Sequence, residues 1–159
     1  MIRALDSDRH GMEVILCRDV DWLLSDEAFS IYSSCMYRPT RQAYRARMER
    51  FVSDPSVKVF VSETQGEKTG VLVLGRSGFA AEIVGIAVSK NRRCQGIGKT
   101  MIHHVMESEK LEKITAQTDD DAVGFYRKCG FTEEKTVTEY PDGVAVRYHC
   151  SLCKNKSCL

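Results

Sequence analysis

The sequence predicts one α/β domain, of the mixed α+β kind, in which helices flank a central sheet of antiparallel and parallel strands. Two observations lead to this fold class. After a largely helical first third the pattern changes to strands, and a strand, helix, strand order in the second half requires a parallel crossover. With 159 residues the chain is long enough for one hydrophobic core, so we expect residues 1–159 to form a single domain.

The first third is expected to hold a short strand and then helices. Ile2 to Leu5 suit the strand, and residues 7–52 read mostly as helical. The clearest helix is PTRQAYRARMERFV, in which Thr40 can act as the N-cap. Its apolar residues recur at roughly helical spacing, at Ala43, Met48, Phe51 and Val52. Pro55 ends this part of the chain.

Three strands are expected next. VKVFVSE and TGVLVLG flank TQGEK, whose glycine and polar residues suit a hairpin turn. FAAEIVGIAV is apolar on both faces for most of its length, as a central strand covered on both sides would be. Glu82 interrupts this run, and Gly85 in its middle indicates a β-bulge.

The remainder predicts a helix, a strand, a second helix and a hairpin. IGKTMIHHVMESEK is amphipathic, with an apolar stripe at Ile97, Met101, Ile102, Val105 and Met106. EKITAQT follows as a strand, and DDDAVGFYRKCG as a helix that Gly130 ends. FTEEKTVTEYPDGVAVRYHCSL forms the closing hairpin, and residues 151–159 are expected to be a flexible tail.

The charge balance argues against nucleic-acid binding. The 23 basic and 22 acidic side chains give a net charge of +1, whereas nucleic-acid-binding proteins usually carry a strong positive patch. No apolar run approaches the roughly 20 residues of a membrane-spanning helix, and the first residues lack a secretory signal. We therefore expect a cytoplasmic protein with no nucleic-acid or membrane partner, and a homodimer is left open. Seven cysteines in such a chain favour reduced thiols.

The segment RRCQGIGKT, residues 92–100, predicts an anion-binding turn. It lies between a strand and a helix, where free backbone amides and the positive end of the helix dipole meet. Gly96 and Gly98 would let a phosphate approach the backbone, because they have no Cβ atom. Positive charge nearby comes from Arg92, Arg93 and Lys99.

Three ligand patterns can be compared with this segment, and a tight turn without a ligand is the alternative. The nucleotide pattern G-x-x-x-x-G-K-[ST] fits Gly98, Lys99 and Thr100 but needs glycine where Arg93 stands. The dinucleotide pattern G-x-G-x-x-G needs glycine at Met101. The pattern [RQ]-x-x-G-x-[GA] fits at every position, with Arg93, Cys94, Gln95, Gly96, Ile97 and Gly98.

With this motif the chain resembles the GNAT family of N-acetyltransferases, whose members bind the pyrophosphate of acetyl-coenzyme A (acetyl-CoA) at this turn. AEIVGIAV is similar to the family's fourth strand, and AVGFYRKCGF to its A-x-x-F-Y-x-x-x-G-F segment. The resemblance is strongest over residues 57–150. It implies a GNAT-like domain that uses acetyl-CoA as cosubstrate and receives its acceptor between the N-terminal helices and the last hairpin.

The resemblance also implies which residues bind acetyl-CoA. Ile86, Ala87 and Val88 would contact the pantetheine arm through their backbone. The pyrophosphate would lie on Arg93, Cys94, Gln95, Gly96, Ile97, Gly98, Lys99 and Thr100. Asp119 stands where many relatives carry an asparagine that contacts pantetheine.

Two residues are candidates for acid and base. Tyr126 occupies the position where many relatives place a tyrosine that protonates the departing thiolate, and a packed aromatic residue is the alternative. Glu82 resembles a glutamate that serves as the base in the histone-acetylating branch, and burial in the apolar strand would favour this use. A solvent-facing Glu82, with water as the base, is the alternative.

The C-terminal HCSLCKNKSC contains possible zinc ligands at His149, Cys150, Cys153 and Cys158. Adjacent strand residues such as His149 and Cys150 point to opposite faces, so we expect no metal.

Taken together, the motifs and the resemblance predict an enzyme that moves an acetyl group from acetyl-CoA to a primary amine by direct attack in a ternary complex. The alternatives are a non-catalytic acyl-CoA-binding module and, less favoured, a P-loop nucleotide-binding protein. The sequence does not identify the acceptor.

Overall fold

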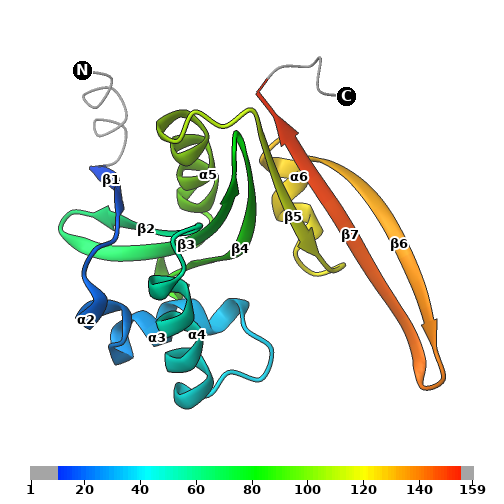
Figure 1. Ribbon diagram of the computed structural model, residues 1–159, viewed down its shortest axis with the longest axis horizontal. Helices are drawn as coiled ribbons and strands as arrows, with labels where there is room; N and C mark the ends of the chain where they lie inside the picture. The colour runs from blue at the N-terminus through cyan, green and yellow to red at the C-terminus, as the bar shows by residue number, and fades with distance from the viewer. Residues whose placement is uncertain (1–10, 155–159) are drawn as a thin grey trace.

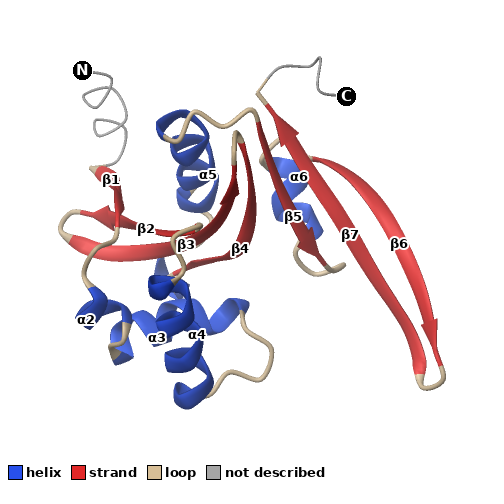
Figure 2. Cartoon of the chain, viewed as in Figure 1, coloured by secondary structure: helices blue, strands red, loops and turns tan. Residues whose placement is uncertain are grey.

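The computed structural model describes residues 11–154 and contains a seven-stranded mixed sheet with helices on both sides (Figures 1 and 2). The strands are β1 (Met12–Leu16), β2 (Val57–Thr64), β3 (Glu67–Ser77), β4 (Ala80–Val88), β5 (Lys113–Thr118), β6 (Thr132–Tyr140) and β7 (Gly143–Cys153). The α-helices are α2 (Val20–Leu23), α3 (Asp26–Tyr32), α4 (Arg41–Ser53), α5 (Ile97–Ser108) and α6 (Val123–Lys128). Two 3₁₀ turns, η1 (Ser33–Cys35) and η2 (Lys90–Arg92), complete the described elements.

The strand order is β1-β2-β3-β4-β5-β7-β6. Of the neighbouring pairs only β4 and β5 run parallel, and α5 forms the crossover between them. This arrangement confirms the predicted mixed α/β fold. No helix within residues 11–154 is long and apolar enough to cross a membrane.

The N-terminal prediction was partly wrong. Residues 12–16 were expected to be helical but form β1, which pairs antiparallel with the end of β2. Met12 and Val14 are buried while Glu13 is exposed, and this alternation is that of a half-buried strand. The strand predicted at Ile2 to Leu5 lies outside the described residues.

The sheet separates two hydrophobic clusters. On one face, α5 and α6 pack against alternate residues of β2 to β5, and α5 buries the whole predicted stripe from Ile97 to Met106. On the other face, α2, α3 and α4 cover the valines of β2 and β3. Because successive strand residues point to opposite faces, one strand supplies both clusters.

The helix α4 begins as predicted, since Thr40 Oγ1 accepts a hydrogen bond of 3.0 Å from the Ala43 amide. Its buried side is nevertheless displaced from the predicted stripe. Tyr44 and Met48 are buried, whereas Ala43 and Val52 are exposed.

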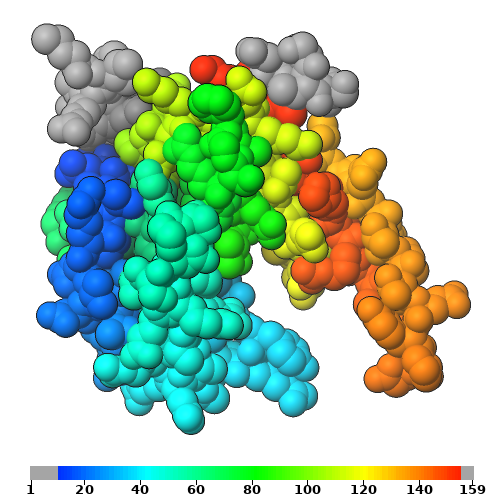
Figure 3. All heavy atoms as spheres, viewed as in Figure 1, coloured from blue at the N-terminus to red at the C-terminus, as the bar shows by residue number. Residues whose placement is uncertain are grey.

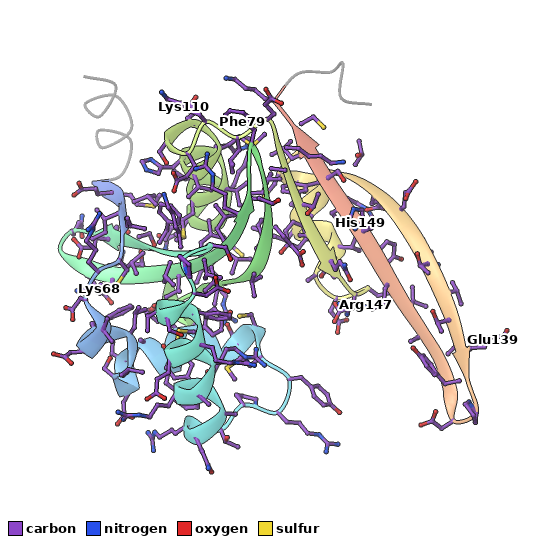
Figure 4. The ribbon with its side chains drawn as sticks, in the orientation of Figure 1. Lys68, Phe79, Lys110, Glu139, Arg147 and His149 are labelled. Carbon is purple, nitrogen blue, oxygen red and sulfur yellow. The ribbon has the colours of Figure 1, made fainter. Side chains whose placement is uncertain are left out.

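The hairpin β6–β7 projects away from the rest of the sheet as a long arm (Figure 1). Strand β5 pairs with β7 only from Lys113 opposite Cys153 to Thr118 opposite Tyr148, so the rest of β7 pairs with β6 alone. Figure 4 shows Arg147 next to the end of this pairing and Glu139 near the tip of the arm. Residues 151–153 belong to β7, so the predicted tail cannot begin at residue 151.

Candidate functional site

A gap opens between the two parallel strands in the middle of the sheet (Figure 1). Strands β4 and β5 pair from Ala80 opposite Lys113 to Ile83 opposite Ala116 and then separate. Beyond that point β4 stays paired with β3 as far as Val88, so its other edge is free. Free strand edges offer backbone donors and acceptors to a ligand.

The bulge predicted at Gly85 lies at the beginning of this gap. Val73 pairs with Gly85 and Leu74 with Ile83, so Val84 has no partner on β3. The Tyr32 hydroxyl occupies the space where a Cβ atom on Gly85 would lie. Glycine is therefore required here by the close approach of Tyr32, in addition to its role in the bulge.

At the far end of β4, the loop before α5 presents unpaired amides. No amide from Cys94 to Lys99 donates a hydrogen bond within the described chain, and the first helical bond runs from Thr100 N to Gly96 O at 3.0 Å. Gly96 has φ +77° and nothing within 4 Å of a Cβ atom built on it. A turn of this kind at a helix N-terminus suits an anion.

Packing explains why the second glycine of the motif, Gly98, has no side chain. A Cβ atom on Gly98 would come within 2.9 Å of two ring carbons of Phe125. Gly98 is buried, so its missing side chain lets α5 pack on α6. The phosphate contacts predicted for Gly96 and Gly98 stay predictions, and the space beside Gly96 is open.

The basic residues of the loop differ in their availability. Arg92 Nη2 donates to Glu67 Oε2 at 2.9 Å, and this ion pair ties Arg92 to the start of β3. Arg93 Nε donates to the Val88 carbonyl at 3.2 Å, and Arg93 is exposed with no acidic partner in residues 11–154. Arg93 and the exposed Lys99 are therefore the cations available to an anion at this loop.

A pocket of about 1010 Å³ lies beside the same loop. It is bounded by the loop, by the exposed side of α5 and by the β2–β3 turn, through Arg92, Gln95, Lys99, His103 and Gln65 among others. The pocket does not reach Gly85 or Tyr126. The pocket is therefore separate from the part of the gap that lies next to the Gly85 bulge.

Tyr126 combines a buried ring with an open hydroxyl group. Its ring packs edge-on against Phe125 and Phe131, with centroid distances of 5.1 and 5.2 Å. The hydroxyl makes no hydrogen bond in the described chain. The hydroxyl oxygen is also accessible to solvent. Within residues 11–154, Arg92 Nε is the only side-chain nitrogen or oxygen that is both buried from solvent and without a hydrogen-bond partner. Burial, and then the neighbouring Cys150, Cys35 and Cys129, raise the pKa of Tyr126, so the phenol stays protonated.

Of the two environments left open for Glu82, the structure has the solvent-facing one. Glu82 and Val84 are exposed while Ala81 and Ile83 are buried, so the first half of β4 alternates and is not covered on both faces. Glu82 lies on the face of β4 that also carries Gly85, because the bulge at Val84 shifts the alternation by one residue. Helices α2 to α4 cover this face only farther along the sheet.

Asp119 has a local structural role. Its Oδ1 accepts hydrogen bonds from the amides of Asp121 and Ala122, at 3.0 and 3.1 Å. These bonds shape the turn that leads into α6. One carboxylate oxygen of Asp119 is therefore already engaged, and the predicted contact with pantetheine stays a prediction.

The C-terminal residues considered as zinc ligands do not form a cluster in the described part of the chain, and no group of three or more His, Cys, Asp or Glu there could hold a metal. His149 is exposed and Cys150 is buried on the opposite face. Cys158 lies outside the described residues.

Sequence reasoning missed the residues that line the bulge from the helical side. Tyr32 ends α3, and Cys35 lies in η1, where its thiol donates to the Tyr32 carbonyl at 3.2 Å. The thiol also lies against the backbone amide of Ile86, one of the residues predicted to contact pantetheine. No local pattern marks these side chains, because the contact joins segments about fifty residues apart.

Comparison with known proteins agrees with this geometry. The family model described as "Acetyltransferase (GNAT) domain" matches residues 55–133, which include β2 to β5, the loop and α6. No curated protein matches the chain.

Solved structures of acetyltransferases share the fold at low sequence identity. The ribosomal-protein-S18-alanine N-acetyltransferase of Escherichia coli has a TM-score of 0.67 and 15% identity, over 89% of this chain and 93% of that one. A Bacillus subtilis acetyltransferase in complex with CoA has a TM-score of 0.67 and 16% identity, over 91% and 99%. A putative streptothricin acetyltransferase of Bacillus anthracis in complex with acetyl-CoA has a TM-score of 0.56 and 21% identity, over 67% and 68%. From the family model and this shared fold, together with the glycine loop and the open strand pair, we conclude that the chain belongs to the GNAT acetyltransferase family.

Proposed function

We propose that this protein moves an acetyl group from acetyl-CoA to a primary amine by direct attack in a ternary complex. The observation that carries the proposal is the separation of β4 from β5 beyond Ile83 and Ala116. The Gly85 bulge lies at one end of the resulting gap, and the loop with its free amides lies at the other. The CoA and acetyl-CoA bound to the Bacillus subtilis and Bacillus anthracis relatives support the choice of cosubstrate.

The residues present fit such a cosubstrate. The pyrophosphate would accept hydrogen bonds from the amides between Cys94 and Lys99, with the Arg93 guanidinium beside them. Gly96 leaves the approach open. The pantetheine arm would follow the free edge of β4 along Ile86, Ala87 and Val88. The pocket beside the loop has room for the nucleotide end.

In the reaction, the amine nitrogen attacks the thioester carbonyl carbon. A C–N bond forms, the C–S bond breaks, and the departing thiolate takes a proton from Tyr126. The raised pKa of the Tyr126 phenol, caused mainly by burial, means that the proton is present at every physiological pH. Tyr126 then recovers a proton from solvent, with which its hydroxyl is in contact.

The amine must lose a proton to become the amide, and Glu82 or water would accept it. Exposure leaves Glu82 free to exchange that proton with solvent. The acceptor would enter from the hollow between the loop that precedes α4 and the β6–β7 arm, which Figure 3 shows as an open space between the cyan and orange surfaces. The two substrates would thus meet at the bulge from opposite directions.

The test is an acceptor screen with acetyl-CoA, in which release of free CoA thiol is followed. Amine-dependent thiol release, with one acetylated amine formed per thiol, is the expected result. Thermal unfolding is measured in parallel with acetyl-CoA and with ATP, since a ligand at 100 times its Kd adds about 2.7 kcal/mol. Stabilisation by acetyl-CoA without turnover of any amine would indicate the non-catalytic module. Stabilisation by ATP alone would reject the proposal.

A further inference from the structure

Arg47 differs from the other arginines of α4 because its side chain extends from the side of the helix that carries the buried residues. Tyr44 and Met48 are the buried residues of α4, and Arg47 lies three residues after the first and one before the second. Residues three apart share a helix face. Arg47 is accordingly half-buried. The remaining arginines of the helix are exposed, and these are Arg41, Arg45 and Arg50.

The ring of Tyr32 lies between this side of α4 and the bulge of β4 at Gly85. The rings of Tyr44 and Tyr32 are in contact, with their centroids 6.0 Å apart. The Tyr32 hydroxyl in turn abuts Gly85. Arg47 therefore projects on the side of α4 that leads, by way of Tyr32, to the point where the thioester is proposed to lie.

The electrostatics of the neighbouring groups agree with this placement. Desolvation raises the pKa of the Cys35 thiol to about 11, and the nearby Arg47 guanidinium acts against this shift. Burial likewise raises the pKa of Tyr32, and Arg47 again opposes it. Arg47 is thus the positive charge that acts on the groups lining the bulge.

Arg47 also lacks the counter-charge that Arg41 and Arg45 have. Arg41 pairs with Asp26 at 3.0 Å and Arg45 with Glu49 at 3.1 Å. No hydrogen bond or ion pair joins the Arg47 guanidinium to any other residue between 11 and 154, and its nitrogens are not sealed from solvent. A half-buried guanidinium that solvent reaches and no acidic residue pairs is available to bind an anion.

We propose that Arg47 binds a carboxylate of the acceptor, so that the acceptor is an amine that also carries a carboxylate, such as an amino acid or a peptide with a free acid group. The inference deepens the proposed function and rests on it. A planar guanidinium can hold a carboxylate through two parallel hydrogen bonds, which fixes the orientation of the bound molecule.

The negative charge of Glu82, on the same face of the sheet, would add to this preference for an aminocarboxylate. Glu82 is exposed and lies on the face of β4 that carries Gly85. An aminocarboxylate held by Arg47 would place its ammonium group toward Glu82, across the bulge. A simple amine would gain only the Glu82 interaction and would be oriented less well.

The first test uses matched acceptor pairs that differ by one carboxylate. Lysine is compared with cadaverine, phenylalanine with phenethylamine, and a peptide acid with its amide, all with acetyl-CoA. The member with the carboxylate is expected to have the higher kcat/KM, and Arg47→Gln to lower this value about 10- to 100-fold while sparing the member without a carboxylate. Arg47→Lys should recover part of the loss.

Arg50→Gln is the matched control, because it removes the same charge from an exposed position of α4. It should leave both members of each pair unchanged, and thermal unfolding should show that all variants are folded. If cadaverine and phenethylamine react as well as lysine and phenylalanine, the inference is wrong while the proposed function stands. If no amine reacts, the proposed function fails.

A second test requires no turnover. Cys35 is an exposed residue, and at alkaline pH its thiolate displaces iodide from iodoacetate, an anion, or from iodoacetamide, which is neutral. Peptide mapping gives the rate at Cys35 for each reagent. We expect Arg47→Gln to lower the ratio of the iodoacetate rate to the iodoacetamide rate about two- to fivefold, and Arg50→Gln to leave it unchanged. Equal ratios in wild type and Arg47→Gln would overturn the inference.

Discussion

The Tyr32 hydroxyl lies against Gly85, in the space that any larger residue at position 85 would need. This contact joins the end of α3 to the bulge of β4, and it holds the helical layer against the free edge of the strand. The same contact places Cys35 and Arg47 beside the proposed reaction centre.

Gly85→Ala should therefore destabilise the protein. The new methyl group would overlap Tyr32, whose ring is fully buried and cannot move away freely, and such overpacking typically costs about 1–3 kcal/mol. Urea unfolding measures the loss. Gly124→Ala is the control, because Gly124 lies within α6 and has nothing within 4 Å of its missing side chain. That substitution should be neutral or stabilise the protein. Equal effects of the two substitutions would contradict the contact.

The loop and the α5 stripe could be predicted from the sequence because both are local patterns. The repeat from Ile97 to Met106 specifies the buried side of one helix, and the glycine motif lies within six residues. The bulge at Gly85 could also be predicted, since a glycine inside an apolar strand often marks a bulge or the close approach of another group.

What the sequence did not predict depends on contacts between distant segments. MEVIL forms β1 only because the free edge of β2 is available to it. Whether Glu82 is buried depends on how far the helices extend over β4, and they end before it. The packing of Gly98 against Phe125 could not be predicted, because Phe125 lies in a helix that begins 25 residues later in the sequence.

Gly98→Ala is expected to weaken the packing of α5 on α6. Its methyl group would meet the Phe125 ring at 2.9 Å, so the midpoint of thermal unfolding should fall. Phe125→Leu in the same chain should restore part of the loss by making room. If the double variant is no more stable than Gly98→Ala alone, the two residues do not act through this contact.

Tyr126→Phe is expected to lower kcat about 10²- to 10⁴-fold while leaving the KM for acetyl-CoA nearly unchanged. The ring packing is kept and only the proton is lost, so stability should not change. Because burial raises the pKa of Tyr126, the wild-type rate should not fall through ionisation of this group up to about pH 10. Tyr140→Phe, at the exposed tip of the arm, is the control. A higher KM with kcat preserved would make Tyr126 a binding residue instead.

Alkaline solution should destabilise the fold through its buried thiols. Burial raises the pKa of Cys129 from an ordinary value of 9.0 to about 11. Above pH 9 the unfolded chain therefore loses the Cys129 proton while the folded chain keeps it, and the free energy of unfolding falls as the pH rises to about 11. Urea unfolding under reducing conditions should show this fall, and Cys129→Ala should make it shallower. An identical pH dependence in the variant would exclude Cys129 as a source.

The most direct measurement is a crystal structure of the complex with CoA, and the decisive distance is that from the CoA sulfur to the Tyr126 hydroxyl oxygen. We expect the pantetheine arm in the gap between β4 and β5, the pyrophosphate on the amides between Cys94 and Lys99, and a separation of about 3–3.5 Å at the sulfur. CoA bound away from the gap, or a sulfur beyond the reach of Tyr126 directly or through one water, would contradict the account.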